Sequence, residues 1–294
     1  MVVRLEDTKL SLETNGFRVD AIERIPIGVM TDKFLFYSAG KKYVARCFPK
    51  DRGYLAEAEY NYMKSFRERG ILCPRPMCCL EVGCNACLIY EYLEGRMLTD
   101  VYDGMNKTEK NAICREIVQN YMRISRIPCK GYGAMKGYEQ FESQSIEGWL
   151  TVVTNNAEEW LLQHEAQSRL AQRVLDKFKA MIWGIKIEQP VLVWSDFSKD
   201  NIIVNEQGKL AGFVDLEGLM AADVNLGVGY MQAHENNSEF FTKMIELLPI
   251  MIEQTNFYSL LRYLVLLPNS YEALPNGTKR QSLNDYLPYI QTII

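Results

Sequence analysis

Three polar side chains near the middle of the chain, each beside a short apolar run, constrain the fold more than any other feature. The stretch from Val191 to Asp223 reads VLVWSDFSKDNIIVNEQGKLAGFVDLEGLMAAD and contains Asp196, Asn201 and Asp215. LVW, IIV and LAGFV are apolar segments bounded by polar residues, which predicts short buried strands separated by a loop and a turn. The chain therefore needs a fold that holds these three side chains at strand ends.

This spacing suits phosphoryl transfer. A carboxylate can accept the proton of an attacking hydroxyl, while an amide oxygen and a second carboxylate hold Mg²⁺ on a nucleoside triphosphate. The alternative is a chance match, since Asp and Asn are common in loops. The position of Asp215, directly after the next apolar run, favours the functional interpretation.

The composition is that of an ordinary globular protein. Its 294 residues, 48% hydrophobic and 24% charged, suffice for one large domain or two small ones. A net charge of −4 gives no reason to expect a nucleic-acid or anionic-membrane surface. Residues 1–95 carry 14 Lys/Arg against 13 Asp/Glu, and the remainder carries 19 against 24. The acidic second part would suit a cationic ligand, although an ordinary solvated surface has the same composition.

The sequence predicts a cytoplasmic protein. No apolar run reaches membrane-spanning length, and the start, MVVRLEDTKLSLE, lacks the apolar core of a signal peptide. In the cytosol thiols stay reduced, so disulfides are not expected.

Cysteines cluster in one segment of the first half. Five of the eight lie between residues 73 and 87, and Cys84-Asn-Ala-Cys87 has CxxC spacing. A zinc site would need four converging thiolates. MCCLEVGCNACLIYEY instead predicts two strands around a turn, with cysteines as small buried hydrophobic residues, so neither a metal nor a redox role is expected.

The N-terminal part predicts strands followed by a helix. IERIPIGVMTDKFLFYSAGKKYVARCF reads as three strands, with Gly28 in the first connection and a tight turn at Ala39–Lys42. A glycine loop can offer backbone N–H groups to phosphates, although one glycine is equally typical of a plain turn. The guanidinium of Arg46 could bridge two phosphate oxygens, or it could be an exposed strand-end cation. AEAEYNYMKSFRERG predicts a helix that ends at Gly70.

These motifs together resemble the aminoglycoside phosphotransferase and choline kinase superfamily. SDFSKDNIIV and VDLEG are similar to its HGDxxxxN-[IV]-[LV] and [IV]-D-[WFL]-E segments. The resemblance implies that Asp196 is the catalytic base and that Asn201 and Asp215 are Mg²⁺ ligands. Two further positions bear on it. Trp194 replaces the family's usual His, which puts the loop's hydrogen bonding in doubt, and Asp223 would brace the catalytic loop.

The resemblance also implies a nucleotide site in the N-terminal part. IGVMTDKF is similar to the family's phosphate loop, which implies contacts from Gly28 and Thr31, although the family's second glycine is missing. Arg46 stands where the family has its phosphate-binding cation. Glu59 would pair with that cation, and Glu57 is the nearby alternative.

LIYEYLEG resembles the family's inter-lobe hinge. Adenine would bond main-chain groups near Glu91 and Leu93, and Ile89 would shape its pocket, while Gly95 lets the chain turn into the second lobe. The resemblance thus implies an α+β, two-lobed, protein-kinase-like fold, with a small β-rich N-lobe over residues 1–95 and a larger, mainly helical C-lobe over 96–294. Apolar stripes in the second part predict helices there, which are more typical of a core than of a site.

By the same resemblance we expect a Mg²⁺-dependent kinase that transfers the γ-phosphoryl group of ATP or GTP to a hydroxyl of a cationic small molecule. An aminoglycoside-type antibiotic ranks first, with resistance by phosphorylation, and Glu147, Glu235 and Glu239 are candidates for its amines. Choline, another amino-alcohol or a sugar are alternative acceptors. From another class, a nucleotide-binding pseudokinase scaffold stays open. We expect no nucleic-acid or membrane partner, and a monomer or homodimer.

Overall fold

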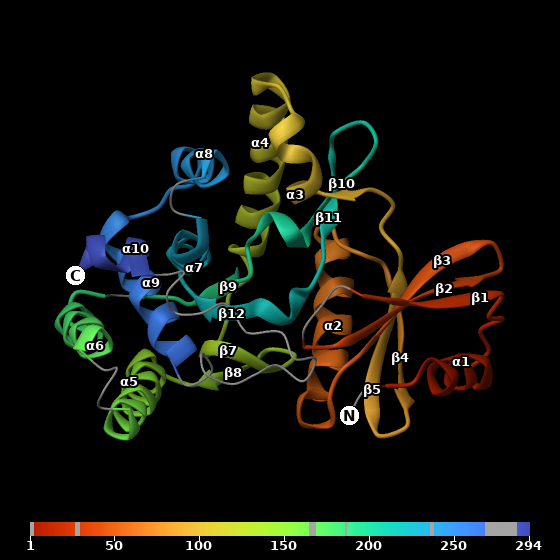
Figure 1. Cartoon of the computed structure of the whole chain (residues 1–294), viewed down its shortest axis with the longest axis horizontal. Coiled ribbons are helices and arrows are strands. Elements are labelled where there is room, and N and C mark those ends of the chain that lie inside the picture. The colour runs from red at the N-terminus through yellow and green to blue at the C-terminus, as the bar shows by residue number, and fades with distance from the viewer. Residues whose placement is uncertain (1–2, 27–29, 165–168, 186, 236–237, 268–286) are drawn as a thin grey trace. The chain divides into compact units, whose positions relative to one another are not determined.

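The computed structural model describes residues 3–26, 30–164, 169–185, 187–235, 238–267 and 287–294, and the chain forms two compact units (Figure 1). The first unit comprises Met1–Met105, Met135–Gln140 and Lys199–Glu217. The second comprises Asn106–Ala134, Phe141–Ser198 and Gly218–Ile294. The chain thus enters the first unit three times, and the predicted lobe boundary at residue 95 stays a prediction.

The first unit is built on a five-stranded antiparallel sheet, which confirms the strands predicted before and after the first long helix. The strand order is β1-β2-β3-β5-β4, with β1 (Ala21–Ile25), β2 (Asp32–Ser38), β3 (Lys41–Cys47), β4 (Pro76–Val82) and β5 (Asn85–Glu91). Ala39 and Gly40 both have positive φ, 50° and 74°, as a two-residue hairpin turn requires. That turn fixes the register of β2 on β3, in which Lys33 lies opposite Arg46.

The two faces of this sheet have different partners. Residues of α1 (Leu5–Thr14) contribute to an apolar core on one face, together with Phe34, Phe36, Ala45 and Ile89. Helix α2 (Tyr54–Glu68) contacts β4 and β5. Because strand side chains alternate between faces, Lys33 and Arg46 point away from the face that carries Phe34 and Ala45.

A second, three-stranded sheet in this unit holds two of the predicted site residues at its ends. It has the order β11-β10-β6, formed by β6 (Arg96–Met97), β10 (Ile202–Val204) and β11 (Leu210–Phe213), and α3 (Leu98–Val101) follows β6. Gly95 precedes β6 with φ 148°, and a Cβ there would lie 2.4 Å from the Val204 carbonyl oxygen. Glycine is thus required where the chain enters this sheet.

The second unit is mainly helical, as predicted (Figure 1). Its described helices are α4 (Lys107–Ile124), α5 (Ile146–Gln163), α6 (Arg169–Ile182), α7 (Asn225–Glu235), α8 (Glu239–Leu247), α9 (Ile252–Leu266) and α10 (Leu287–Ile293). Asn106 and Glu109 form a reciprocal capping box at the start of α4. Helix α9 contacts α5, α6, α7 and α10 and so occupies the centre of this unit. No helix in the described ranges is long and apolar enough to cross a membrane.

A four-stranded sheet completes the architecture. Its order is β8-β7-β12-β9, formed by β7 (Tyr132–Gly137), β8 (Gln140–Ser143), β9 (Val191–Trp194) and β12 (Leu219–Ala222). The sequence pattern predicted β9, but not the β7–β8 hairpin. YGAMKG contains two glycines and alternates only weakly, so its strand character depends on pairing with β12.

Candidate active site

Arg46, at the centre of a buried ionic cluster in the first unit, is the best-defined feature of the site. Its side chain is 1% exposed. Nη1 donates to Oε1 and Oε2 of Glu59 at 3.0 and 2.9 Å. Nη2 donates to Asp215 and, at 2.8 Å, to Oε2 of Glu217. One guanidinium thus joins β3, α2 and the segment after β11, and three carboxylates share it.

This contact settles which helix glutamate pairs with the cation. Glu59 is fully buried, whereas Glu57 is exposed on α2. Two residues apart on a helix, the two side chains project about 200° apart, so only one can face the sheet. Glu59, the preferred candidate, is that residue.

Thr31, directly before β2, and Lys33, in β2, complete the cluster. Nε of Arg46 donates to Oγ1 of Thr31 at 3.1 Å, which places this predicted loop residue beside the cation. Nζ of Lys33 donates to Oδ2 of Asp215 at 2.9 Å. The sequence interpretation missed Lys33. The register implied by the Ala39–Gly40 turn was the available signal, because it places Lys33 directly opposite Arg46.

The charges in this cluster compete with one another. Burial alone would raise the pKa of Asp215, but the positive charges of Arg46 and Lys33 lower it to about 2. Burial raises the pKa of Glu59 to about 8 against the attraction of Arg46, and the charges of Asp215 and Glu217 add to the rise. The cluster has three carboxyl groups and two cations, and a proton on Glu59 removes the surplus negative charge.

We expect this proton to give a pH-dependent stability. The folded state binds it more tightly than the unfolded chain, whose Glu59 has the ordinary pKa of 4.5. The contribution of Glu59 is therefore present below pH 4.5 and is lost as the pH rises to about 8. Urea unfolding across this window should give a free energy that falls less steeply in Glu59→Gln than in the wild type. Equal slopes would contradict the assignment.

Asn201 and Asp215 lie close together in the first unit. The N–H of Val214 donates to the Asn201 carbonyl at 3.0 Å, and Ile202 pairs with Phe213 in the β10–β11 ladder. Asp215 has φ 62°, a conformation that costs a non-glycine residue energy and that is typical of functional positions.

The donor set fits a magnesium ion that also takes ligands from a nucleotide. Asp215 supplies a carboxylate and Asn201 an amide oxygen, both hard oxygen donors. In the described ranges no three His, Cys, Asp or Glu side chains are grouped so that they could hold a metal. Mg²⁺ commonly binds through one or two protein oxygens plus substrate phosphates, and these residues match that mode.

Ile89, predicted to line the adenine pocket at the hinge, lies in the apolar core of the first unit. Ile89 is fully buried in the core cluster that includes Phe34 and Ala45, on the sheet face opposite Arg46. The resemblance implied that Ile89 shapes an adenine pocket. Its side chain instead packs in this apolar core, because strand alternation points it away from the face that carries Arg46. Leu88, which pairs with Arg46, lies on the same face of the sheet as Arg46.

The remaining nucleotide residues stay candidates. The N–H of Glu91 already donates to the Arg75 carbonyl at 2.9 Å, so an adenine contact in this stretch rests more on Leu93. Leu93 is half-buried, and a Cβ on Gly212 would lie 3.0 Å from its Cδ1. Gly28 lies outside the described residues.

Asp196 lies in the second unit, exposed on the loop after β9. Both the N–H and the hydroxyl of Ser195 donate to the Gly218 carbonyl, at 2.8 and 2.7 Å. A Cβ on Gly218 would lie 2.8 Å from the Cβ of Asp196, so this glycine keeps space beside the carboxylate. Trp194, which replaces the family's usual His, is fully buried. Ser195 provides hydrogen bonds that hold this loop in place of that His.

Asp223 has the contacts of a bracing residue. Its Oδ1 accepts from the N–H and the side-chain amide of Asn225 at 2.8 and 2.6 Å, and its Oδ2 accepts from the Tyr258 hydroxyl at 2.7 Å. The Tyr121 hydroxyl donates to the carbonyl of Val224, the residue after Asp223, at 3.0 Å. The Tyr121 ring stacks on Phe197 with a centroid distance of 4.6 Å. Phe197 directly follows Asp196, so this chain of contacts supports the loop.

The tip of the β7–β8 hairpin is attached to helix α2 within the first unit. The N–H of Glu139 donates to the Tyr62 hydroxyl at 3.1 Å, and the rings of Tyr62 and Tyr138 are 4.9 Å apart. Glu139 has φ 56°, which this contact helps to hold. Tyr62 lies one turn after Glu59 on α2, so the hairpin tip supports the helix that positions the ion pair.

Tyr62→Phe should therefore lower the free energy of unfolding by about 0.5–1.5 kcal/mol, because it removes the acceptor for the Glu139 N–H and keeps the ring. Tyr60→Phe, on the same helix, is the matched control and should leave the urea midpoint unchanged. Equal midpoints for the two variants would show that the hydroxyl contact contributes nothing.

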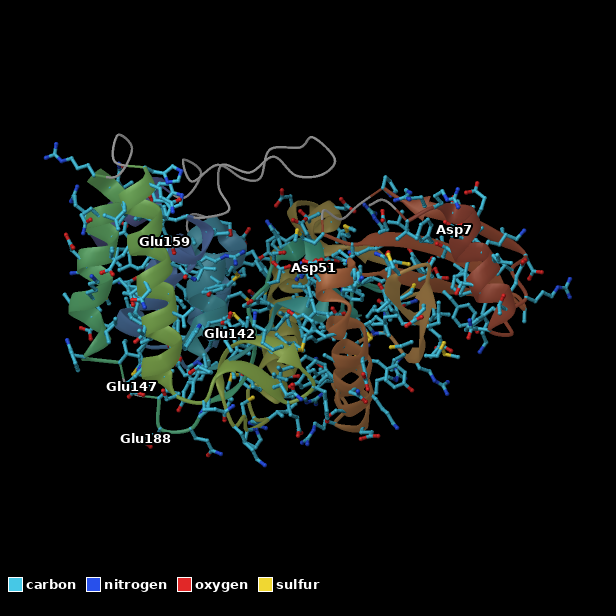
Figure 2. The ribbon with its side chains drawn as sticks, turned by 90° about the horizontal axis from the view of Figure 1, so that it is seen from below. Asp7, Asp51, Glu142, Glu147, Glu159 and Glu188 are labelled. Atoms are coloured by element: carbon cyan, nitrogen blue, oxygen red, sulfur yellow. The ribbon has the colours of Figure 1, made fainter. Side chains whose placement is uncertain are left out.

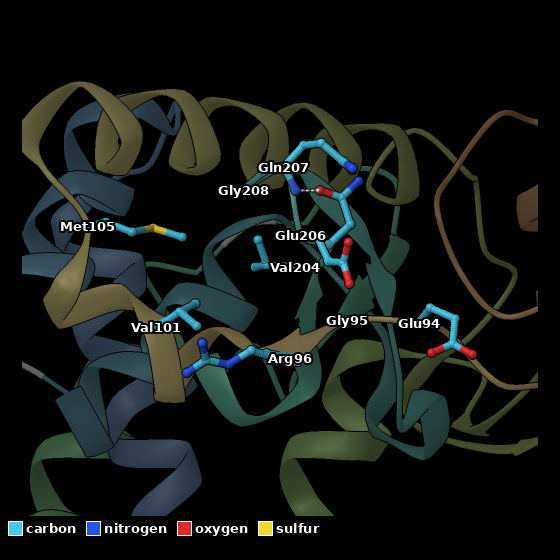
Figure 3. A pocket seen from close by; sticks show the side chains of 10 residues that line it. Glu94, Gly95, Arg96, Val101, Met105, Val204, Glu206, Gln207 and Gly208 are labelled. Atoms are coloured by element: carbon cyan, nitrogen blue, oxygen red, sulfur yellow. Dashed lines mark hydrogen bonds between the residues drawn. The ribbon is translucent and has the colours of Figure 1, made fainter.

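A pocket of about 700 Å³ lies in the first unit beside β6 and β10 (Figure 3). Its apolar lining comes from Val101, Met105 and Val204, and charged Arg96 and Glu206 stand at its walls. The predicted site residues do not line it.

The acidic residues proposed for the acceptor differ in their contacts. Glu147 is exposed near the start of α5, and Glu159 is exposed further along the same helix (Figure 2). Glu239 forms an ion pair with Lys110 at 2.7 Å, and that hydrogen bond lowers the pKa of its carboxyl group. The side chain of Glu235 lies outside the described residues. Glu147 remains the most available candidate of the three.

Solved structures with this fold include aminoglycoside phosphotransferases. APH(4)-Ia aligns with a TM-score of 0.76 at 16% identity, over 99% of this chain and 97% of that chain. Its thermostable mutant in a ternary complex with AMP-PNP and hygromycin B aligns with a TM-score of 0.73 at 17% identity, over 97% and 95%. A mutant of the 2′-phosphotransferase IIIa with GDP aligns with a TM-score of 0.72 at 15% identity, over 99% and 96%. These likenesses confirm the predicted kinase-like fold class.

The family itself is established by sequence. A search of curated proteins gave no match. A family model described as the phosphotransferase enzyme family, however, matches residues 21–242. This range runs from the first strand of the five-stranded sheet through the Asp196 loop and Asp215 into α8, well over half of the 294 residues. The chain therefore belongs to the phosphotransferase enzyme family.

Proposed function

We propose that the protein transfers the γ-phosphoryl group of ATP or GTP, with Mg²⁺, to a hydroxyl of a cationic small molecule of the aminoglycoside class. The observation that carries this proposal is the cluster around Arg46. A buried guanidinium held by Glu59, beside a second cation and an aspartate at a strand end, is suited to binding and neutralising a polyphosphate.

In this proposal Arg46 and Lys33 change partners when nucleotide binds. Both cations contact Asp215 in the structure. Phosphate oxygens would accept from the two cations, and Asp215 and Asn201 would hold Mg²⁺. The metal would neutralise charge on the phosphate oxygens when bound. Glu59 stays on Arg46 and orients its guanidinium, so the cation meets the phosphates in a fixed position.

Asp196 is the proposed base. It is exposed on a loop that Ser195 and Gly218 fix, where an acceptor hydroxyl can reach it. Its carboxylate accepts or orients the hydroxyl proton as the oxygen attacks the γ-phosphorus. Because phosphoryl transfer needs little covalent help from the protein, positioning and charge neutralisation supply most of the acceleration.

The nucleotide site can be tested without knowing the acceptor. Mg²⁺ alone must compete with Arg46 and Lys33 for Asp215, and nucleotide alone must displace Asp215 from the same cations. When both are bound, Mg²⁺ pairs with Asp215 and the phosphates pair with Arg46 and Lys33. The metal and the nucleotide should therefore bind cooperatively. Calorimetry should give a markedly lower Kd for ATP or GTP with Mg²⁺ than without it. Equal affinities would count against this arrangement, and no binding at all would reject the kinase proposal.

The acceptor class is tested by mass spectrometry of a compound panel incubated with the protein, Mg²⁺ and each nucleotide. The exposed acidic residues of the second unit, Glu147 among them, and the hygromycin B bound by the APH(4)-Ia mutant support an aminoglycoside acceptor. An aminoglycoside that gains one phosphoryl group is the expected result. Phosphorylated choline or sugar would replace this acceptor class, and nucleotide binding without any product would favour a scaffold.

A further inference from the structure

Two cysteines from distant parts of the sequence face each other in the five-stranded sheet. Cys47 is the last residue of β3 and Cys87 is the third residue of β5, and the antiparallel register pairs them directly. Their Sγ atoms are 2.9 Å apart. Both side chains are buried, 1% and 0% exposed, in the apolar core against α1.

The sequence spacing pointed to a different pair. Cys84 and Cys87 form the CxxC, but three residues along a strand put side chains on opposite faces. Cys84 is exposed at the Gly83–Asn85 turn, and its thiol contacts the Asn85 side chain at 3.4 Å. Cys87 points into the core, so folding gives it Cys47 as its partner.

The backbone geometry at this pair suits a covalent bond. Directly opposed residues of antiparallel strands have Cβ atoms roughly 4.5–5.5 Å apart, less at positions that are not hydrogen-bonded. Disulfides need Cβ atoms about 3.5–4.5 Å apart. Contact between the two sulfur atoms shows that both side chains already point toward each other.

We propose that Cys47 and Cys87 are an oxidative modification site that closes to a reversible intramolecular disulfide when peroxide is present. One thiol reduces hydrogen peroxide and becomes a sulfenic acid, releasing water. The facing thiol then attacks that sulfur, forming the S–S bond and releasing a second water. Two thiols and one peroxide thus give one disulfide and two waters, with two electrons passing from sulfur to oxygen.

The site is distinct from the Arg46 cluster but adjacent to it in sequence. Cys47 follows Arg46 in β3, and their side chains lie on opposite faces of the sheet. Burial raises the pKa of the Cys87 thiol, so the reaction with peroxide should be slow compared with that of an exposed thiol. This inference does not depend on the proposed kinase activity.

The experiment separates buried from exposed thiols before oxidation. Native full-length protein is treated with N-ethylmaleimide, which blocks exposed Cys79 and Cys84, and then with hydrogen peroxide. Cys73 and Cys114 are also buried, and neither is part of the Cys47–Cys87 pair. The Cys73 thiol contacts the Met63 carbonyl at 3.5 Å. Non-reducing peptide mapping should then show a Cys47–Cys87 link, lighter by two hydrogens, that dithiothreitol removes.

Variants test the pairing. Cys84→Ser should keep the Cys47–Cys87 link in full, and Cys47→Ser should lose every link at Cys87. The wild-type map decides the matter even where Cys47→Ser folds poorly. A Cys78–Cys87 peptide in place of the expected one, or Cys47 and Cys87 thiols that both remain open to alkylation after peroxide and unfolding, would overturn the proposal.

Discussion

Asp196→Asn should lower kcat for phosphoryl transfer by about 10²- to 10⁴-fold, the usual contribution of a positioned general base. The amide keeps the size of the side chain but cannot accept the hydroxyl proton. Asp196 is exposed, so the variant should fold normally and bind nucleotide with the wild-type Kd. Steady-state kinetics and calorimetry on the same preparation would measure both quantities.

Asp200→Asn is the matched control for this change. Asp200 is a second exposed aspartate, four residues further along the chain, with no assigned role. Its substitution should leave kcat unchanged. If both variants retain wild-type turnover, Asp196 is not the base. If both lose it equally, the loop needs its negative charge and no single carboxylate accepts the proton.

Arg46→Met should have the largest effect on stability, lowering the free energy of unfolding by about 3–5 kcal/mol. It leaves the buried Glu59 carboxyl group without its hydrogen-bond donor and removes the positive charge that balances Asp215 and Glu217. Breaking a buried ionic cluster by removing one member carries a cost of that order. Nucleotide binding should be lost as well, because the proposed phosphate ligand is gone. Urea unfolding and calorimetry would measure the two losses.

The double variant Arg46→Met with Glu59→Met separates these two roles. Replacing both members of a buried ion pair with apolar side chains is often neutral for stability, so the double variant should recover much of the loss. It should not recover nucleotide binding. Recovery of both would show that Arg46 has only a structural role. Lys42→Ala, which breaks the exposed Lys42–Glu94 pair, is the control and should change neither quantity.

Much of the fold followed from local sequence patterns. Alternation predicted the strands of the five-stranded sheet, and apolar periodicity predicted helices in the second unit, because both signals reside within one element. The β7–β8 hairpin escaped prediction since its glycines weaken the local pattern. The return of residues 199–217 to the first unit also escaped, because it depends on β10 pairing with β6, about a hundred residues away.

The sequence by itself determined where the candidate site residues stand: Asp196, Asn201 and Asp215 beside short strands, and Arg46 on a strand. The structure narrows the predicted tight turn to Ala39 and Gly40, and this two-residue turn fixes the register that pairs Lys33 with Arg46. Only the tertiary structure decided that Ile89 belongs to the core and that Cys87 faces Cys47. Those outcomes depend on which elements pack against each face of the sheet. Packing of this kind joins residues that are distant in sequence, and no local pattern encodes it.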